Sequence, residues 1–413
     1  MSFMEKLLDG VEVEWKALGE IGEFKYGYTA KAKESGTARF IRISDINSKG
    51  ELIESDAKYV DISKDNEKYI LHKNDLLMAR TGATYGKTLF FNEDYPAIYA
   101  GFLIRLNFNK NILNPRYYWH FAQSNLFWNQ AKKLVSGGGQ PQFNANVLKV
   151  VNVPIPWPDN PTRSLEVQAE IVRILDAFTS LTAELTAELT TRKKQYEYYR
   201  DQLLTFEEGE VEWKTLGEIG TWFGGGTPSK RRRDYWENGT IPWVSPKDMK
   251  HPIVDSSKYY ITEAAIKESS TKLIPANSIA IVVRSSILFK VLPSALIPVP
   301  VTLNQDMKAI IPYRDLIPNY LAHMIRSRGN DILRVARKTG GSVASIESGK
   351  LFSFRIPVPP LDEQARIVAI LDKFDTLINS ISEGLPREIE LRQKQYEYYR
   401  DLLLSFPKPV GFE

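Results

Sequence analysis

Apolar residues recur every three or four positions through two long stretches of the chain. In the first stretch, Leu165–Phe206, they run from Ile171 to Leu203, and in the second they run from Ile367 to Leu403. This spacing predicts an apolar stripe along one face of an α-helix. One helix over the first stretch would be on the order of 60 Å long, longer than most domains are wide. We therefore expect the two stripes to pair as an antiparallel intramolecular coiled coil.

The rest of the chain carries short apolar or alternating runs bounded by Gly, Asn and Asp, which are typical of strands. In the first half these runs are Arg39–Ile43, Asp75–Met78, Leu89–Phe91 and Phe102–Leu106, and in the second they are Ile279–Val283, Val299–Leu303 and Met307–Ile311. One short helix is expected in each half, over Pro115–Lys133 and Pro318–Lys338. The pattern predicts an α+β fold with two strand-rich domains separated by two long helices.

The chain is an internal duplication. Val13–Gly22 reads VEWKALGEIG and Val211–Gly220 reads VEWKTLGEIG, while KQYEYYRD occurs at both Lys194–Asp201 and Lys394–Asp401. Each half is therefore about 200 residues long and the fold should be pseudo-twofold. The sequence divides into a first domain (1–160), a central helix (161–208), a second domain (209–358) and a C-terminal helix (359–413).

The second helical stretch differs from the first, because it contains Gly384 and Pro386. Proline inside a helix costs about 3 kcal/mol, so we expect a break near Glu383–Pro386. The N-terminal segment Leu7–Trp15 also repeats the pattern of Leu203–Trp213, which follows the first long helix. We therefore expect the N-terminus to lie beside the end of the second helix.

Composition narrows the possible chemistry. The chain has 413 residues, a net charge of +4, four histidines and no cysteine. Disulfides, thiolate metal sites and cysteine nucleophiles are excluded, and four scattered histidines argue against a zinc site or histidine-based catalysis. No run of 18 apolar residues and no signal-peptide pattern occurs, so we expect a cytoplasmic protein.

Two similar domains held apart by rigid helices suit a DNA target with two separated half-sites. Cations, amides and hydroxyls make the contacts to DNA phosphates and base edges, and in the candidate segments aromatic residues alternate with them. In the first domain the candidates are Lys25, Tyr26, Tyr28, Lys31, Lys33, Arg42, Ser44, Arg80, Thr81, Lys87, Gln140 and Gln142. In the second domain they are Thr227, Ser229, Lys230, Arg231, Arg232, Arg233, Lys247, Arg284, Asn304 and Gln305.

Four repeated motifs carry a resemblance to a known family. They are the VEWKxLGEIG segments, the Pro-rich segments VPIP (Val153–Pro156) and IPVPP (Ile356–Pro360), the helix starts VQAEIVRILD and EQARIVAILD, and the helix ends KQYEYYRD. Together and in order they resemble the specificity subunits of type I restriction–modification enzymes, over essentially the whole chain.

The resemblance implies a non-catalytic subunit with two target recognition domains, which bind a bipartite, asymmetric site on double-stranded DNA. It also implies that the helices bind two methyltransferase subunits and recruit restriction subunits. S-adenosylmethionine and ATP would be bound by those partners, with no cofactor on this chain.

A perfect tandem, TAELTAEL, lies within the first long helix and comprises Thr182, Ala183, Glu184, Leu185, Thr186, Ala187, Glu188 and Leu189. One TAEL unit adds ~6 Å and a net turn of about 40° to a helix. Adjacent base pairs of B-DNA are rotated by about 34–36°. We hypothesise that the number of TAEL units sets the spacer between half-sites, and one subfamily of specificity subunits is similar in carrying this repeat.

Two other functions remain open from the sequence. A self-contained adenine methyltransferase or nuclease would methylate or cleave DNA as the purified chain alone. A coiled-coil scaffold would show no salt-dependent binding to duplex DNA.

The segment Gly82–Thr88 (GATYGKT) resembles a phosphate-binding loop, but it is one residue short and strand-like residues follow it. We therefore interpret it as a turn that presents Lys87.

Overall fold

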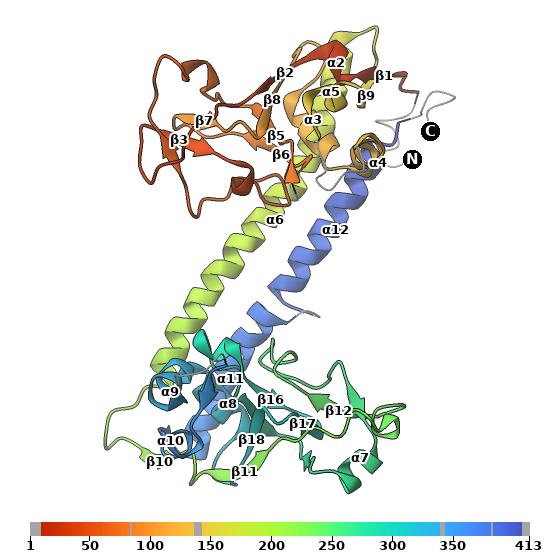
Figure 1. Ribbon diagram of the computed structural model, residues 1–413. Coiled ribbons are helices and arrows are strands. Elements are labelled where there is room, and N and C mark those ends of the chain that lie inside the picture. The colour runs from red at the N-terminus through yellow and green to blue at the C-terminus, as the bar shows by residue number, and fades with distance from the viewer. Residues whose placement is uncertain (1–9, 83–84, 136–142, 339–342, 381–382, 407–413) are drawn as a thin grey trace. The chain divides into compact units, whose positions relative to one another are not determined.

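The computed structural model describes residues 10–82, 85–135, 143–338, 343–380 and 383–406 (Figure 1). The chain folds into two compact units, residues 1–184 with 389–413, and residues 185–388. The boundaries fall inside two helices, α6 (Pro161–Leu203) and α12 (Leu385–Leu403). Each unit therefore contains one globular part, the start of the helix that follows it, and the end of the helix from the other half.

The first unit is built on two sheets and a separate strand pair. The antiparallel sheet has the order β2 (Gly22–Tyr26), β8 (Leu103–Phe108), β5 (Asp75–Ala79), β6 (Thr88–Phe91). The second sheet has the order β4 (Tyr59–Val60), β3 (Ala38–Ile41), β7 (Ala97–Tyr99), and its β3–β7 pair is parallel. Strand β1 (Val13–Ala17) pairs with β9 (Asn152–Pro156), which joins the two ends of the globular part.

The second unit repeats this topology. Its antiparallel sheet has the order β11 (Gly220–Gly224), β18 (Met307–Pro312), β15 (Ser278–Val282), β16 (Ser294–Ile297). Its other sheet has the order β13 (Tyr260–Ile261), β12 (Ile241–Val244), β17 (Val301–Leu303), β14 (Leu273–Ile274), with a parallel β12–β17 pair. Strand β10 (Glu212–Thr215) pairs with β21 (Arg355–Val358). The predicted α+β class and internal duplication are confirmed.

The short helices correct one prediction. Two helices, α3 (Pro115–Ala122) and α4 (Asn125–Leu134), replace the single one expected over Pro115–Lys133. The break occurs because the Ser124 side chain accepts the Phe127 N–H and caps a new helix.

The second half shows the same division. Its helices are α8 (Pro318–Ser327) and α9 (Gly329–Ala336), and Arg337–Lys338 forms strand β19 with β20 (Ser345–Ile346). The remaining short helices are α2 (Leu18–Ile21), α5 (Ala145–Lys149), α7 (Glu263–Glu268) and α10 (Ser348–Phe352).

The long helical stretches follow the apolar pattern. The first is the continuous helix α6, whereas the second is divided into α11 (Leu361–Asn379) and α12. The break predicted near Glu383–Pro386 is confirmed, since Gly384 has a φ of 88° and α12 begins one residue later. Pro386 thus lies in the first turn of α12, where a backbone N–H is not needed.

Helix contacts inside each unit join the two halves of the sequence. Phe178 of α6 stacks on Tyr399 of α12 in the first unit, with ring centroids 5.2 Å apart. Tyr199 of α6 stacks on Phe374 of α11 in the second unit, at 5.9 Å. The start of one helix is therefore packed with the end of the other in each unit, while the antiparallel coiled coil along their full length stays a prediction.

The described part of the N-terminal segment belongs to the same apolar core as the end of α12, while residues 1–9 lie outside the described residues. Val11 and Val13 pack against the apolar core of the first unit, which includes Leu403 and Leu404. In the second unit Leu204, directly after α6, occupies the place equivalent to Leu404.

A buried glutamine joins each long helix to its globular part. The Gln168 amide oxygen accepts the Asn114 N–H at 2.8 Å, and its amide nitrogen donates to the Ile112 carbonyl at 2.9 Å. Gln364 of α11 makes the same two kinds of bond, to Ile317 N–H and to the Asp315 carbonyl. These bonds satisfy backbone groups just before α3 and α8, so they fix where each helix starts against its domain.

A buried histidine connects three helices in the first unit. His120 of α3 lies with its Nε2 2.9 Å from Asp176 of α6 and its Nδ1 2.9 Å from the Tyr396 hydroxyl of α12. One neutral tautomer satisfies both bonds, because Nε2–H donates to the carboxylate and Nδ1 accepts from the hydroxyl. Burial lowers the pKa of His120, although the hydrogen bond to Asp176 raises it. In the second unit His323 contacts Asp372 at 2.8 Å.

We predict that Tyr396→Phe destabilises the first unit by about 1–3 kcal/mol, because a buried imidazole nitrogen would lose its hydrogen-bond partner. Urea unfolding monitored by circular dichroism measures the effect. The matched control is Tyr398→Phe, two residues away on an exposed face, which should leave the unfolding midpoint unchanged. Equal midpoints for both variants would contradict the importance of the buried contact.

Candidate nucleic-acid interface

The two units share a loop cluster with the same backbone hydrogen bonds. In each unit the first residue after β7 or β17 donates its N–H to the carbonyl of the last residue of β3 or β12. The residue after β5 or β15 donates its N–H to the carbonyl of the third residue after β7 or β17. These bonds define equivalent positions. The equivalent pairs, first unit before second, are Ile41 and Val244, Ala100 and Asn304, Phe102 and Asp306, Arg80 and Val283, Tyr26 and Gly224, and Gly27 and Gly225.

Glycine is required at one position of this cluster in both units. A Cβ atom on Gly27 would collide with the carbonyl oxygen of Ala100, and one on Gly225 would collide with that of Asn304. The chain therefore passes directly against the neighbouring loop, which brings the predicted DNA-contact segments that follow Gly27 and Gly225 next to it.

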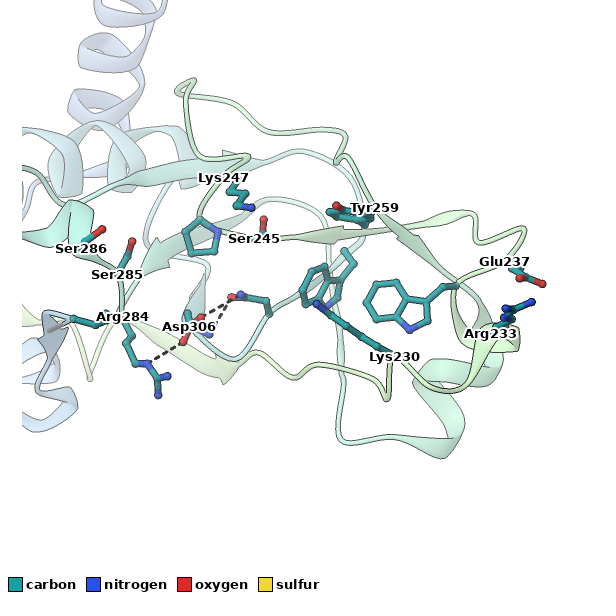
Figure 2. Close-up of a pocket in the computed structure, with 15 residues that line it drawn as sticks. Lys230, Arg233, Glu237, Ser245, Lys247, Tyr259, Arg284, Ser285, Ser286 and Asp306 are labelled. Atoms are coloured by element: carbon teal, nitrogen blue, oxygen red, sulfur yellow. Dashed lines mark hydrogen bonds and ion pairs between the residues drawn. The ribbon is translucent and has the colours of Figure 1, made fainter.

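A cavity of about 770 Å³ lies at the cluster in the second unit (Figure 2). Its lining combines cations, aromatic rings and hydrogen-bonding groups, the chemistry that binds phosphates and base edges. The lining includes Lys230, Arg233, Trp236, Trp243, Ser245, Lys247, Tyr259, Arg284, Ser285, Ser286, Asn304 and Asp306. Five of the predicted contacts, Lys230, Arg233, Lys247, Arg284 and Asn304, are thus brought together.

Two tryptophans hold the loop that leads to the basic cluster. The Trp243 indole donates to the Gly226 carbonyl at 3.0 Å, and the Trp236 indole donates to the Ser229 carbonyl at 3.2 Å. Their rings pack edge to face, 5.2 Å apart. The loop is therefore fixed by side chains whose bulk also lines the cavity.

The four cations of the basic cluster Lys230–Arg233 differ in whether a carboxylate pairs with them. Arg232 pairs with Asp234 at 2.6 Å and Glu268 at 3.0 Å, and its guanidinium lies over the Tyr235 ring. Lys230, Arg231 and Arg233 are exposed and show no ion pair among the residues that the structure describes. Three of the four cations are therefore available to phosphates, whereas Arg232 stabilises the loop.

Polar groups at the other end of the cavity form a short chain of contacts. Arg284 Nε lies 3.3 Å from Asp306 Oδ1, and the Asn304 amide donates to Asp306 Oδ2 at 3.4 Å (Figure 2). Beside them the Thr227 hydroxyl donates to the Gln305 side chain. Lys247 and Ser229 are exposed.

In the first unit the predicted residues are more dispersed. The Arg80 guanidinium lies over the rings of Tyr26 and Phe102. Arg42 is held by Asp45 through two hydrogen bonds, of 2.7 and 3.1 Å, so its charge orders the loop after β3.

The other first-unit candidates differ in exposure and partners. Lys33 pairs with Asp61 at 2.7 Å, Lys25 lies 3.5 Å from Glu23, and Tyr28 packs on Tyr69. Lys31 and Ser44 are exposed, while Thr81 and Lys87 are half-buried. Gln140 and Gln142 lie outside the described residues.

The sequence-based prediction missed Phe102, Trp236, Trp243, Tyr259 and Asp306. Aromatic residues within strand-like runs indicate a core, whereas the predicted DNA contacts are mainly cations, amides and hydroxyls. For Asp306 the sequence offered one signal, because this residue directly follows the predicted contacts Asn304 and Gln305.

Within the described ranges, no group of three or more His, Asp or Glu side chains could hold a metal ion. None of the helices in those ranges combines the length and apolar character needed to cross a membrane.

Comparison with known proteins identifies the family. The family described as type I restriction modification DNA specificity domain matches residues 10–192 and again residues 208–391. The chain belongs to the type I restriction–modification specificity subunits. As such it is the DNA-recognition subunit of a type I restriction–modification complex and performs no catalysis. This assignment replaces the two alternatives that the sequence left open.

Relatives match this specificity subunit over its full length. The EcoR124I/EcoR124II specificity subunit of Escherichia coli is 57% identical, with 99% of this chain and 98% of the relative covered. A putative type I specificity subunit of Haemophilus influenzae is 30% identical, covering 98% of each chain.

Solved structures share the fold. A chain in a structure of a type I restriction–modification system has a TM-score of 0.62 at 15% identity and covers 95% of this chain and 97% of its own. The specificity subunit from M. genitalium has a TM-score of 0.56 at 14% identity, with coverage of 99% and 100%.

We predict that the double substitution Lys230→Gln with Arg233→Gln weakens DNA binding by the assembled complex and makes it less salt-dependent. If each cation neutralises one phosphate, the slope of log affinity against log salt falls by about 2. Fluorescence anisotropy with a duplex carrying the target site, at several salt concentrations, measures this slope. Arg232→Gln is the control, because its charge is already paired; a slope that the double substitution leaves unchanged would argue against phosphate contacts.

Proposed function

We propose that each unit of this specificity subunit reads one half-site of a split, asymmetric target on double-stranded DNA. The observation that carries the proposal is the repeated loop cluster, which has the same backbone in both units but different side chains. Phe102 and Ala100 in the first unit are replaced by Asp306 and Asn304 in the second. Since base edges are read by side-chain donors and acceptors, unlike side chains on like backbones select different sequences.

The predicted DNA contacts are divided by role within this proposal. Exposed cations without an acidic partner bind phosphates and fix the register of each unit on the duplex. Arg284, whose side chain is 64% exposed although it lies beside Asp306, reads base edges from the cavity. Cations that are already paired, such as Arg42 and Arg232, hold the loops in place.

Two methyltransferase subunits bind to the long helices, and the repeated helix ends support this stoichiometry. Tyr196 and Tyr396 are buried, so packing explains their identity. Tyr198 and Tyr398 are 59% and 65% exposed, yet they too are identical, as are their exposed neighbours Lys and Glu. Packing within this chain does not require identical exposed residues at the two helix ends. A partner that binds in two copies, one at each end, does require them.

The methyltransferase subunits supply S-adenosylmethionine, and the restriction subunits, which join the complex, supply ATP. The specificity subunit itself needs no cofactor for recognition. A cytoplasmic location, as the sequence predicts, agrees with access to chromosomal DNA.

We predict that Tyr198→Ala and Tyr398→Ala each weaken the binding of one methyltransferase subunit, because a central exposed tyrosine contributes strongly to an interface. Native mass spectrometry of the assembled complex should show one copy lost in each single variant and both lost in the double variant. The control is Tyr313→Ala, which removes a 52% exposed tyrosine from the second globular part. Two retained copies in the double variant would refute the assignment of this surface.

The TAEL tandem sets the distance and phase between half-sites. The boundary between the two compact units, Glu184–Leu185, falls inside the tandem, and α6 is continuous through it. Each additional unit lengthens this helical connection and rotates it by about 40°, close to the rotation between adjacent base pairs. The chain then belongs to the subfamily whose spacer depends on this repeat.

We predict that inserting a third TAEL after Leu189 lengthens the spacer of the target by one base pair and leaves both half-sites unchanged. Single-molecule sequencing of methylated adenines, in cells that carry the chain with its partner subunits, reads out both features. The wild-type chain should give a two-part motif. Thr182→Ala with Thr186→Ala is the control, since it changes the repeat but not its length; an unaltered spacer in the insertion variant would rule the mechanism out.

A further inference from the structure

An arginine lies against two exposed aromatic rings in the first unit. The Arg80 guanidinium carbon lies 4.9 Å from the centroid of the Tyr26 ring and 5.4 Å from that of Phe102. Both rings remain accessible, with 43% of Tyr26 and 56% of Phe102 exposed. Cation–π attraction holds the guanidinium against both rings, and we call this arrangement the aromatic clamp.

The backbone anchors all three residues of this stack. Arg80 follows β5, its N–H donates to the Phe102 carbonyl at 3.1 Å, and its carbonyl accepts the Phe143 N–H at 2.8 Å. Tyr26 is the last residue of β2, and its hydroxyl accepts the Ala145 N–H at 3.1 Å. A side chain held in this way loses little conformational entropy when it binds a ligand.

The charge of Arg80 has no acidic partner within the described part of the chain. Its Nε is buried and without a hydrogen bond there. In contrast, Arg39, Arg42, Arg105 and Arg116 of the same unit each pair with a carboxylate. The positive charge of Arg80 is therefore not neutralised by any carboxylate of the described residues.

The position of Arg80 corresponds to the wall of the cavity in the second unit. Phe102 is equivalent to Asp306, which lines that cavity together with Arg284. There the aromatic clamp is missing, since Gly224 replaces Tyr26, and the arginine comes one residue later and contacts Asp306 instead. Both units therefore present an arginine at this edge, but they hold it in different ways.

We infer that Arg80 is the residue of the first unit that reads a guanine in the major groove of its half-site. Guanine offers two acceptors, O6 and N7, whose spacing matches the parallel donors of one guanidinium. A guanidinium held against two rings suits this paired geometry. A phosphate, in contrast, is bound equally well by a flexible lysine. This inference rests on the proposed recognition of one half-site by each unit. It assigns one base, guanine, to one side chain, Arg80.

The test maps methylated adenines for the complete complex of this chain with its partner subunits, in Arg80→Ala and Arg80→Lys variants. The wild-type motif must contain a guanine, on either strand, in the half-site that responds to these substitutions. Both variants should reduce the preference for that one base pair by on the order of 10- to 100-fold, leaving the other half-site and the spacer intact. Arg80→Lys keeps the charge, so its affinity should keep the wild-type salt dependence.

Two controls separate the possible results. Arg284→Ala should alter only the other half-site. Phe102→Ala, which removes one of the two rings beside Arg80, should relax the motif at the same base pair as Arg80→Lys. Thermal unfolding of each complex checks that the fold is retained.

Distinct outcomes overturn the inference and the proposed function. A two-part motif that is unchanged in both Arg80 variants, or uniformly weaker methylation that Arg80→Lys restores, would assign Arg80 to a phosphate and overturn the guanine reading alone. A wild-type motif without two parts, or one whose two halves change together in every variant, would overturn the half-site reading itself.

Discussion

The buried polar link between each globular part and its helices is the constraint on which the rest of this structure depends. Imidazole, hydroxyl and amide groups are buried together here, and a partly exposed carboxylate completes the hydrogen bonds that join the three chain segments. Because an unpaired buried group costs free energy, a shifted helix would be penalised at several atoms at once. The link therefore fixes register as well as contact, which a purely apolar stripe would leave adjustable.

This link also explains how a linear duplication becomes two like-built units. Tyr396 contacts His120 in the first unit, and Tyr196 belongs to the core of the second. Each octapeptide KQYEYYRD thus completes the domain of the opposite half. The helix start and the helix end in a unit come from different repeats. The first unit therefore combines two separate segments, residues 1–184 and 389–413, and the second is the one segment 185–388, which crosses the boundary between the repeats.

The recognition surface follows a different rule. Its backbone is repeated closely, down to glycines at which no Cβ is tolerated, while its side chains diverge. A fixed loop frame with variable side chains allows base preference to change without loss of the fold, because the exposed positions carry little packing energy. Arg80 in an aromatic clamp and Arg284 beside a carboxylate show two ways of orienting a guanidinium on that frame.

The sequence by itself determined the duplication, the strand-rich domains, the long helices and the break before Pro386. Those features depend on periodicity and on the local chemistry of proline and glycine, which act within a few residues. Only the tertiary structure decided which cation of the basic cluster pairs with described carboxylates, namely Arg232. It also decided that Phe102 lies against Arg80 and that His120 contacts Tyr396, 276 residues away. Such contacts join residues distant in the chain, and their partners are chosen by packing, which no short-range pattern encodes.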